Sequence, residues 1–176
     1  MKRHALVVMG LAGLLASPLV AQAPTPTPSV PDAIRQQYNT VKNNLLKAAD
    51  KMPEDGYDFK PTPEERSFGG WVLHVADAQA QGCARALGTP PVILMNPVKT
   101  KAGIVEYLKG SFQTCDSAYA ALTDANASEP IPSYRGPTPR LAALAGNIEH
   151  DNECYGSMAV YLRLKGIVPP SSEPRH

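Results

Sequence analysis

Two side chains that bind metal ions well, those of His150 and Cys154, are four residues apart in a stretch with a helical pattern. Residues at positions i and i+4 lie on the same face of a helix, so the imidazole and the thiolate can converge on one point. Imidazole nitrogen and thiolate sulfur are preferred ligands of zinc and similar borderline metals. One helix supplies only these two ligands, so a third must come from another segment.

His74 is the candidate for the third ligand. The chain has four histidines, of which His4 lies in an apolar leader and His176 is the last residue. The spacing H-x3-C on a helix is by itself a weak motif. The alternative is that His74 and His150 are ordinary hydrogen-bonded histidines at helix interfaces, and that Cys154 is simply a buried thiol.

The amino terminus has the three parts of a bacterial secretory signal. A short basic start precedes an apolar run over residues 5–16, and the small residues Ala21 and Ala23 form a cleavage site. We therefore predict removal of residues 1–23 and a periplasmic or secreted location. An uncleaved anchor is the alternative, although the run is short for a membrane-spanning helix. Residues 24–30 follow as a stiff spacer rich in proline and threonine.

The composition does not indicate a nucleic-acid partner. The formal net charge is +1, and acidic and basic residues are mixed along the chain, whereas nucleic-acid-binding domains carry basic patches. The sequence also lacks a P-loop, a dinucleotide-binding fingerprint and a nucleophile elbow. We expect an unidentified small molecule as the partner, no nucleic acid, and no stable membrane span after signal cleavage. A homodimer is left open.

Four helical segments are predicted to position the candidate ligands, near residues 31–52, 63–87, 100–123 and 138–165. Their apolar residues recur at alternating steps of three and four, as on a helix with one face on a core. Residues 62–65 (Thr-Pro-Glu-Glu) form a capping box, and Thr138 with Pro139 gives the last segment a similar start. The sequence predicts an all-α four-helix bundle over residues 31–170, without a sheet, and a tail at 171–176.

The other two cysteines, Cys83 and Cys115, are predicted to form a disulfide between the second and third helices. Cys83 is nine residues beyond His74, so the two side chains point to roughly opposite faces of a continuous helix and cannot share a metal ion. Cys115 lies on the apolar stripe of the third helix, and an oxidising compartment favours pairing. Two separate buried thiols are the alternative. Cys154 is left unpaired.

Three segments together resemble the DinB-like superfamily of four-helix, metal-binding proteins, and most closely its secreted members. These segments are residues 52–64, 71–77 and 150–172. In that family, one histidine of the second helix and two histidines in an H-x3-H pattern on the fourth helix bind a divalent metal. The resemblance implies His74 and His150 as ligands, whereas Cys154 stands where the family has histidine.

The resemblance implies a divalent-metal site, and the thiolate of Cys154 makes zinc the favoured metal over nickel or manganese. Three protein ligands leave a position open for water, as in catalytic metal sites. The implied function is a metal-dependent hydrolase or transferase of unknown substrate, with Asp77 and Glu153 as candidate bases or hydrogen-bond partners of the ligands. The alternative is a non-catalytic metal- or ligand-binding module, because Cys154 is also what a degenerate site would show.

Overall fold

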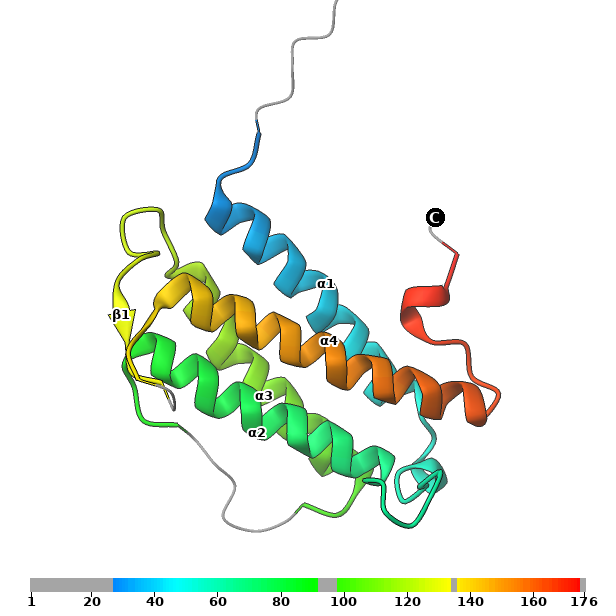
Figure 1. The fold of residues 1–176 in the computed structure, drawn as a ribbon. Coiled ribbons are helices and arrows are strands. Elements are labelled where there is room, and N and C mark those ends of the chain that lie inside the picture. Colours follow the sequence, from blue (N-terminus) through cyan, green and yellow to red (C-terminus); the bar gives the residue numbers. More distant parts are fainter. Residues whose placement is uncertain (1–26, 92–97, 134–135, 175–176) are drawn as a thin grey trace, which may run out of the picture.

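The computed structural model describes residues 27–91, 98–133 and 136–174. The predicted signal peptide lies outside these described residues. The elements, in chain order, are α1 (Val30–Lys51), a short 3-10 helix (Glu54–Gly56), α2 (Phe68–Leu87), α3 (Lys101–Ala120), β1 (Pro130–Ile131), β2 (Thr138–Pro139), α4 (Arg140–Leu164) and a second 3-10 helix (Pro170–Ser172). The four long helices form one bundle (Figure 1), which confirms the predicted all-α four-helix fold.

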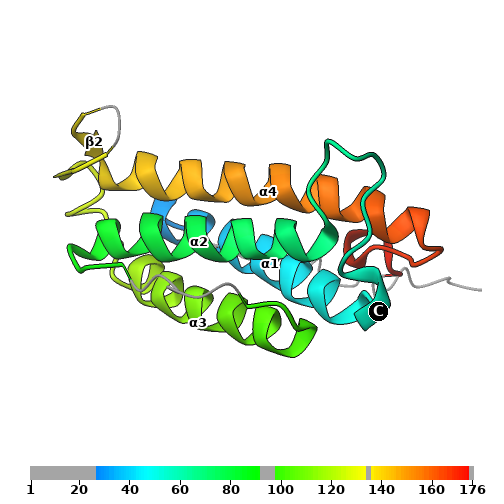
Figure 2. The same ribbon diagram turned by 90° about the horizontal axis from the view of Figure 1, so that it is seen from below.

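The apolar stripe of each helix faces the centre of the bundle. In α1, for example, Tyr38, Val41, Leu45 and Ala48 are at most 2% exposed, as their spacing predicted. Helices α1 and α2 each pack against both α3 and α4, so α1 and α2 lie diagonally across the bundle (Figure 2). Among the described residues, no helix has the length and apolar character needed to cross a membrane.

Helix α2 begins later than its capping box predicted. Residues 62–65 form a turn, closed by a hydrogen bond of 3.2 Å from the amide of Glu65 to the carbonyl of Thr62. The helix starts at Phe68, and the hydroxyl of Ser67 accepts a hydrogen bond of 3.1 Å from the amide of Gly70. The predicted start at residue 63 was therefore wrong, and Ser67 is the N-cap.

The connection between α1 and α2 determines where α2 begins. Its carbonyls at Tyr57 and Phe59 accept hydrogen bonds from the amides of Gly69 and Phe68, at 2.8 and 3.1 Å. These are amides of the first helical turn, which have no acceptor within the helix. The connection is fixed in turn because Tyr57, only 4% exposed, donates a hydrogen bond of 2.7 Å to the carbonyl of Ala49. The connection thus packs over the end of the bundle.

A small antiparallel ribbon precedes α4, so the prediction of a fold without any sheet was wrong. Strand β1 pairs with β2 through Pro130 with Pro139 and Ile131 with Thr138. Because Thr138 and Pro139 belong to β2, α4 begins at Arg140. The chain after α3 folds back on itself to form this ribbon at one end of the bundle (Figure 1).

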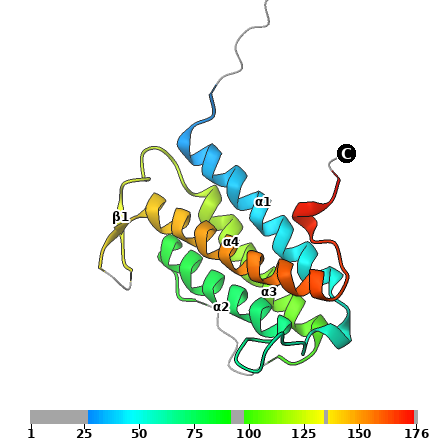
Figure 3. The same ribbon diagram turned by 45° about the vertical axis from the view of Figure 1, so that its right-hand side comes forward.

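Helix α2 is joined covalently to α3. Cys83 and Cys115 form a disulfide with their Cα atoms 4.9 Å apart, which agrees with the predicted pairing. Cys154 is the free cysteine of the chain's described residues and is buried. The chain after α4 turns back to the end of α1 (Figure 3), where Lys51 Nζ contacts Glu173 Oε1 at 2.5 Å.

Candidate metal centre

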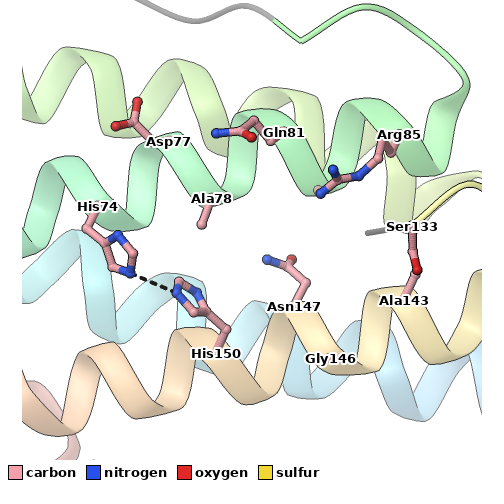
Figure 4. Close-up of a pocket in the computed structure, with 11 residues that line it drawn as sticks. His74, Asp77, Ala78, Gln81, Arg85, Ser133, Ala143, Gly146, Asn147 and His150 are labelled. Atoms are coloured by element: carbon pink, nitrogen blue, oxygen red, sulfur yellow. Dashed lines mark hydrogen bonds between the residues drawn. The ribbon is translucent and has the colours of Figure 1, made fainter. Parts of the chain in front are cut away.

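The three predicted ligands converge between α2 and α4. His74 comes from α2, and His150 and Cys154 come from successive turns of α4. The Nε2 atoms of the two histidines are 3.1 Å apart (Figure 4), and Cys154 Sγ is 3.6 Å from His150 Nε2. The three ligand atoms all lie within 4.8 Å of one another. His150 and Cys154 thus lie on one face of α4, and this face is turned toward His74 of α2.

These separations are close to those of a tetrahedral zinc site. Bonds of about 2.0–2.1 Å to nitrogen and about 2.3 Å to sulfur place the ligand atoms of such a site about 3.3–3.6 Å apart. The 3.1 Å between the histidines and the 3.6 Å between Cys154 and His150 are near this range. Two imidazoles and one thiolate also form a ligand set that suits zinc. The donor set therefore fits a divalent metal, and binding would draw the widest pair of ligand atoms, up to 4.8 Å apart, together by about 1 Å.

A buried carboxylate that the sequence analysis missed lies behind His150. Asp151 is fully buried, and its Oδ2 accepts a hydrogen bond of 2.5 Å from Gln79 Nε2 of α2. Its Oδ1 lies 3.7 Å from His150 Nδ1 and has no hydrogen-bond partner within the described residues. The signal in the sequence is an acidic residue on the apolar stripe of α4, three residues after Ile148 and four before Tyr155.

The two histidines have opposite protonation tendencies. The nearby carboxylate of Asp151, together with Cys154, raises the pKa of His150 to about 10. Burial and the nearby charge of Arg66 lower the pKa of His74. In the metal-free protein, a proton lies between the two Nε2 atoms in their 3.1 Å contact. A bound metal ion would take the place of this proton, because it needs both Nε2 lone pairs.

The two candidate bases lie in different surroundings. Asp77 lies at the cavity wall near His74, and its Oδ1 accepts a hydrogen bond of 2.6 Å from the Tyr107 hydroxyl of α3. Glu153 is exposed on α4. Trp71 stands edge-on to the imidazole of His74, with ring centroids 5.9 Å apart. Of the two carboxylates, Asp77 is the one among the residues that line the cavity.

A cavity of about 660 Å³ extends from the histidines along the groove between α2 and α4 (Figure 4). Such a volume is typical of small-molecule sites, which span roughly 300–1,000 Å³. Its polar lining, apart from the histidines and Asp77, is Gln81, Arg85, Ser133 and Asn147. No motif of the sequence indicated these residues, although Ala78, Gln81 and Arg85 continue the helical stripe that starts at His74.

Comparison with known proteins agrees with this architecture. The crystal structure of a DinB-like protein from Bacillus cereus superposes with a TM-score of 0.68 at 17% identity, covering 79% of this chain and 95% of that one. A DinB-like protein from Bacillus subtilis gives 0.65 at 17% identity, covering 82% and 99%. A conserved protein from Enterococcus faecalis gives 0.63 at 14%, covering 78% and 98%.

Structural similarity at such low identity concerns the fold alone. No protein of curated function shows a significant match to the sequence. The family comparison is the more specific, because the sequence model of the DinB superfamily matches residues 37–157, which include all three candidate ligands and more than half of the chain. The chain therefore belongs to the DinB superfamily.

Proposed function

We propose that this protein binds a divalent metal ion, zinc, through His74, His150 and Cys154, and hydrolyses a small molecule held in the adjoining cavity. The observation that carries the proposal is the convergence of the three ligand atoms within 4.8 Å of one another. His74 and His150 line the cavity, whereas Cys154 is buried behind them. The three ligands would thus hold an ion from one side and leave the cavity side open.

A zinc ion with an open position lowers the pKa of water and polarises a carbonyl group. The protein's own residues complete the site. Asp151 orients His150 from behind, so that its Nε2 faces the ligand position. Asp77, among the residues that line the cavity, would serve as the base for such a water. Tyr107 holds the Asp77 carboxylate in place through its hydrogen bond of 2.6 Å.

Metal analysis tests the proposal. Protein purified without chelator should contain zinc, and chelated protein should take up zinc again. His74→Gln and His150→Gln should each lose the metal, because two ligands hold zinc much more weakly than three. Asn152→Ala is the matched control: this exposed residue lies on α4 between the two ligands and bonds only the carbonyl of Ile148 among the described contacts. Zinc uptake that is the same in all variants would contradict the assignment.

Hydrolysis is tested separately, with zinc-loaded and chelated protein against a panel of small esters, amides and lactones. Zinc-dependent turnover that falls in Asp77→Asn, while zinc content stays constant, supports the hydrolase. A second candidate function is metal-dependent ligand binding without turnover. It is favoured by the short hydrogen bond from Tyr107 to Asp77, because this bond already occupies one oxygen of the carboxylate that hydrolysis would use as its base. Zinc-dependent binding, with the bound molecule recovered unchanged, would establish that second function.

We further propose that the protein is exported and loses residues 1–23. The disulfide between Cys83 and Cys115 supports this, because disulfides persist mainly in oxidising compartments. Mass spectrometry of the protein made with its leader in a bacterial host tests the proposal. A periplasmic product beginning at Pro24 is expected. A product retained in the cytoplasm with its leader intact would contradict it.

A further inference from the structure

We infer that the cavity binds a small elongated carboxylate, with the carboxylate group on Arg85 and the other end of the molecule at the metal ligands. The inference rests on the proposed function and adds the chemical class of the substrate. The cavity has two polar ends that differ in chemistry: His74 and His150 lie at one, and Arg85 and Ser133 lie at the other (Figure 4).

The two ends are separated along the length of α2. Arg85 is eleven positions beyond His74, which corresponds to about 16 Å of helix at about 1.5 Å per residue. Side chains on a helix lean toward its amino terminus, and the long side chain of Arg85 reaches farther in that direction than the imidazole of His74, which shortens this span. Figure 4 shows the guanidinium of Arg85 directed toward the space between α2 and α4. An elongated molecule can therefore reach both ends.

Small residues keep the groove between the ends open. On the α2 side these are Ala78 and Gly82, and on the α4 side Ala143 and Gly146. A Cβ atom added to Gly82 or Gly146 would meet no atom within 4 Å. Glycine destabilises the middle of a helix relative to alanine, so neither crowding nor helix stability explains these glycines. Their effect is to keep the groove wide enough for a ligand.

The charges in the cavity favour a carboxylate over a phosphate. Arg85 presents a planar fork that matches a carboxylate with two parallel hydrogen bonds. Its five N–H donors suffice for a partner within the protein and for a ligand. Asp77 lies in the same cavity, so a dianionic phosphate would meet one arginine and one repelling carboxylate. A singly charged carboxylate balances these charges better.

Dicarboxylates of increasing length probe the distance between the two ends. Zinc-loaded protein is titrated calorimetrically with succinate, adipate, suberate and sebacate, and with octanoate as the monocarboxylate matched to suberate. One carboxylate should contact the metal site and the other Arg85. The best dicarboxylate should bind about 10- to 100-fold more tightly than its matched monocarboxylate, the range expected for charge-assisted hydrogen bonds.

Variants assign this advantage to Arg85. Arg85→Gln should remove the preference for the dicarboxylate, and Arg85→Lys should keep part of it. Arg163→Gln is the control, because Arg163 is exposed at the end of α4 and bonds Ser172 instead. Gly146→Leu should fill the groove and weaken every ligand, while zinc affinity stays unchanged. Circular dichroism and thermal unfolding verify that each variant is folded.

The outcomes separate this inference from the proposed function. If zinc binds but Arg85→Gln keeps the full dicarboxylate preference, the inference is wrong and the metal function stands. If zinc does not bind but suberate binding still depends on Arg85, the metal function fails and the carboxylate site stands. If the analogue of suberate with one terminal phosphonate binds more tightly than suberate itself, the ligand class is phosphate-like and the carboxylate assignment is overturned.

Discussion

Asp151 follows His150 directly in α4, and its buried carboxylate lies on the side of the imidazole opposite the ligand atom. The distance from Asp151 Oδ1 to His150 Nδ1 is 3.7 Å, while Asp151 Oδ2 accepts a hydrogen bond from Gln79. A carboxylate behind a ligating histidine fixes its tautomer and its orientation and makes it a stronger ligand. Asp151 thus orients the His150 ring for metal binding without being a ligand itself.

Asp151→Asn should lower zinc affinity about 10- to 100-fold, the usual loss when the partner of a ligating histidine is changed. The substitution preserves the size of the side chain but removes its charge. Glu149→Gln makes the same change of charge at an exposed position of α4, directly before His150, and should leave zinc affinity as it is. Competition with a chromogenic chelator measures both constants. Equal affinities for the two variants would show that Asp151 has only a structural role.

The identity of the third ligand should determine the preferred metal. Cys154→Ser should weaken zinc binding strongly, because a neutral hydroxyl replaces a thiolate. Cys154→His should keep zinc and bind nickel at least as well as the wild type, since three imidazoles suit both metals. Zinc and nickel titrations of the three proteins give the comparison. Cys154→Ser with undiminished zinc affinity would remove Cys154 from the ligand set.

The stability of the metal-free protein should depend on pH through His150. Its pKa is raised from 6.5 to about 10 on folding, chiefly through Asp151. The folded protein therefore holds this proton more tightly than the unfolded chain does, and the contribution of His150 to the free energy of unfolding is full below pH 6.5. It is lost as the pH rises from 6.5 to about 10.

Urea denaturation of chelated wild type and His150→Gln over this pH range measures the effect as the difference between the two proteins. The difference should shrink as the pH rises. His74 has the opposite sign, since its pKa is lowered on folding. The difference between wild type and His74→Gln should therefore shrink as the pH falls through 6.5. A flat difference for His150→Gln would contradict the assigned protonation.

Removing the disulfide should destabilise the fold and leave the metal site in place. Closing the loop of 32 residues between Cys83 and Cys115 stabilises the protein by about 3–4 kcal/mol in the chain-entropy model. The double variant Cys83→Ala and Cys115→Ala should lose about this much free energy of unfolding and keep its zinc affinity. Peptide mapping without reductant should find Cys154 free. A disulfide that includes Cys154 would rule out its thiolate as a ligand.

The sequence predicted the helices well because their signal is local and repeated. The stripe of α1 recurs over its whole length, and its members are buried in the structure. The start of α2 depended instead on carbonyls of Tyr57 and Phe59, which no local motif reveals. The ribbon of β1 and β2 likewise depends on pairing between two short segments, Pro130–Ile131 and Thr138–Pro139, too short for any periodic signal.

In the candidate site too, the residues that neighbour each other on one helix were predicted from their spacing, and those whose role depends on a second helix were not. His150 and Cys154 are neighbours on one helix, so their spacing alone placed them together. His74 was added by elimination and by the family resemblance. Asp151 and Arg85 were missed because their roles depend on a second helix: Asp151 is buried against Gln79 of α2, and Arg85 enters the cavity only because small residues of α4 face it.

The disulfide has a further consequence for how the ligands are assembled during folding. His74 and His150 are 76 residues apart along the backbone. Once Cys83 is linked to Cys115, the shortest covalent path between the two histidines runs through the sulfur bridge and is little more than half as long. Loop closure over the shorter path costs about 0.5 kcal/mol less entropy. The oxidised chain therefore brings its two histidines together at a lower entropy cost. Forming the disulfide thus favours assembly of the ligands before a metal ion binds.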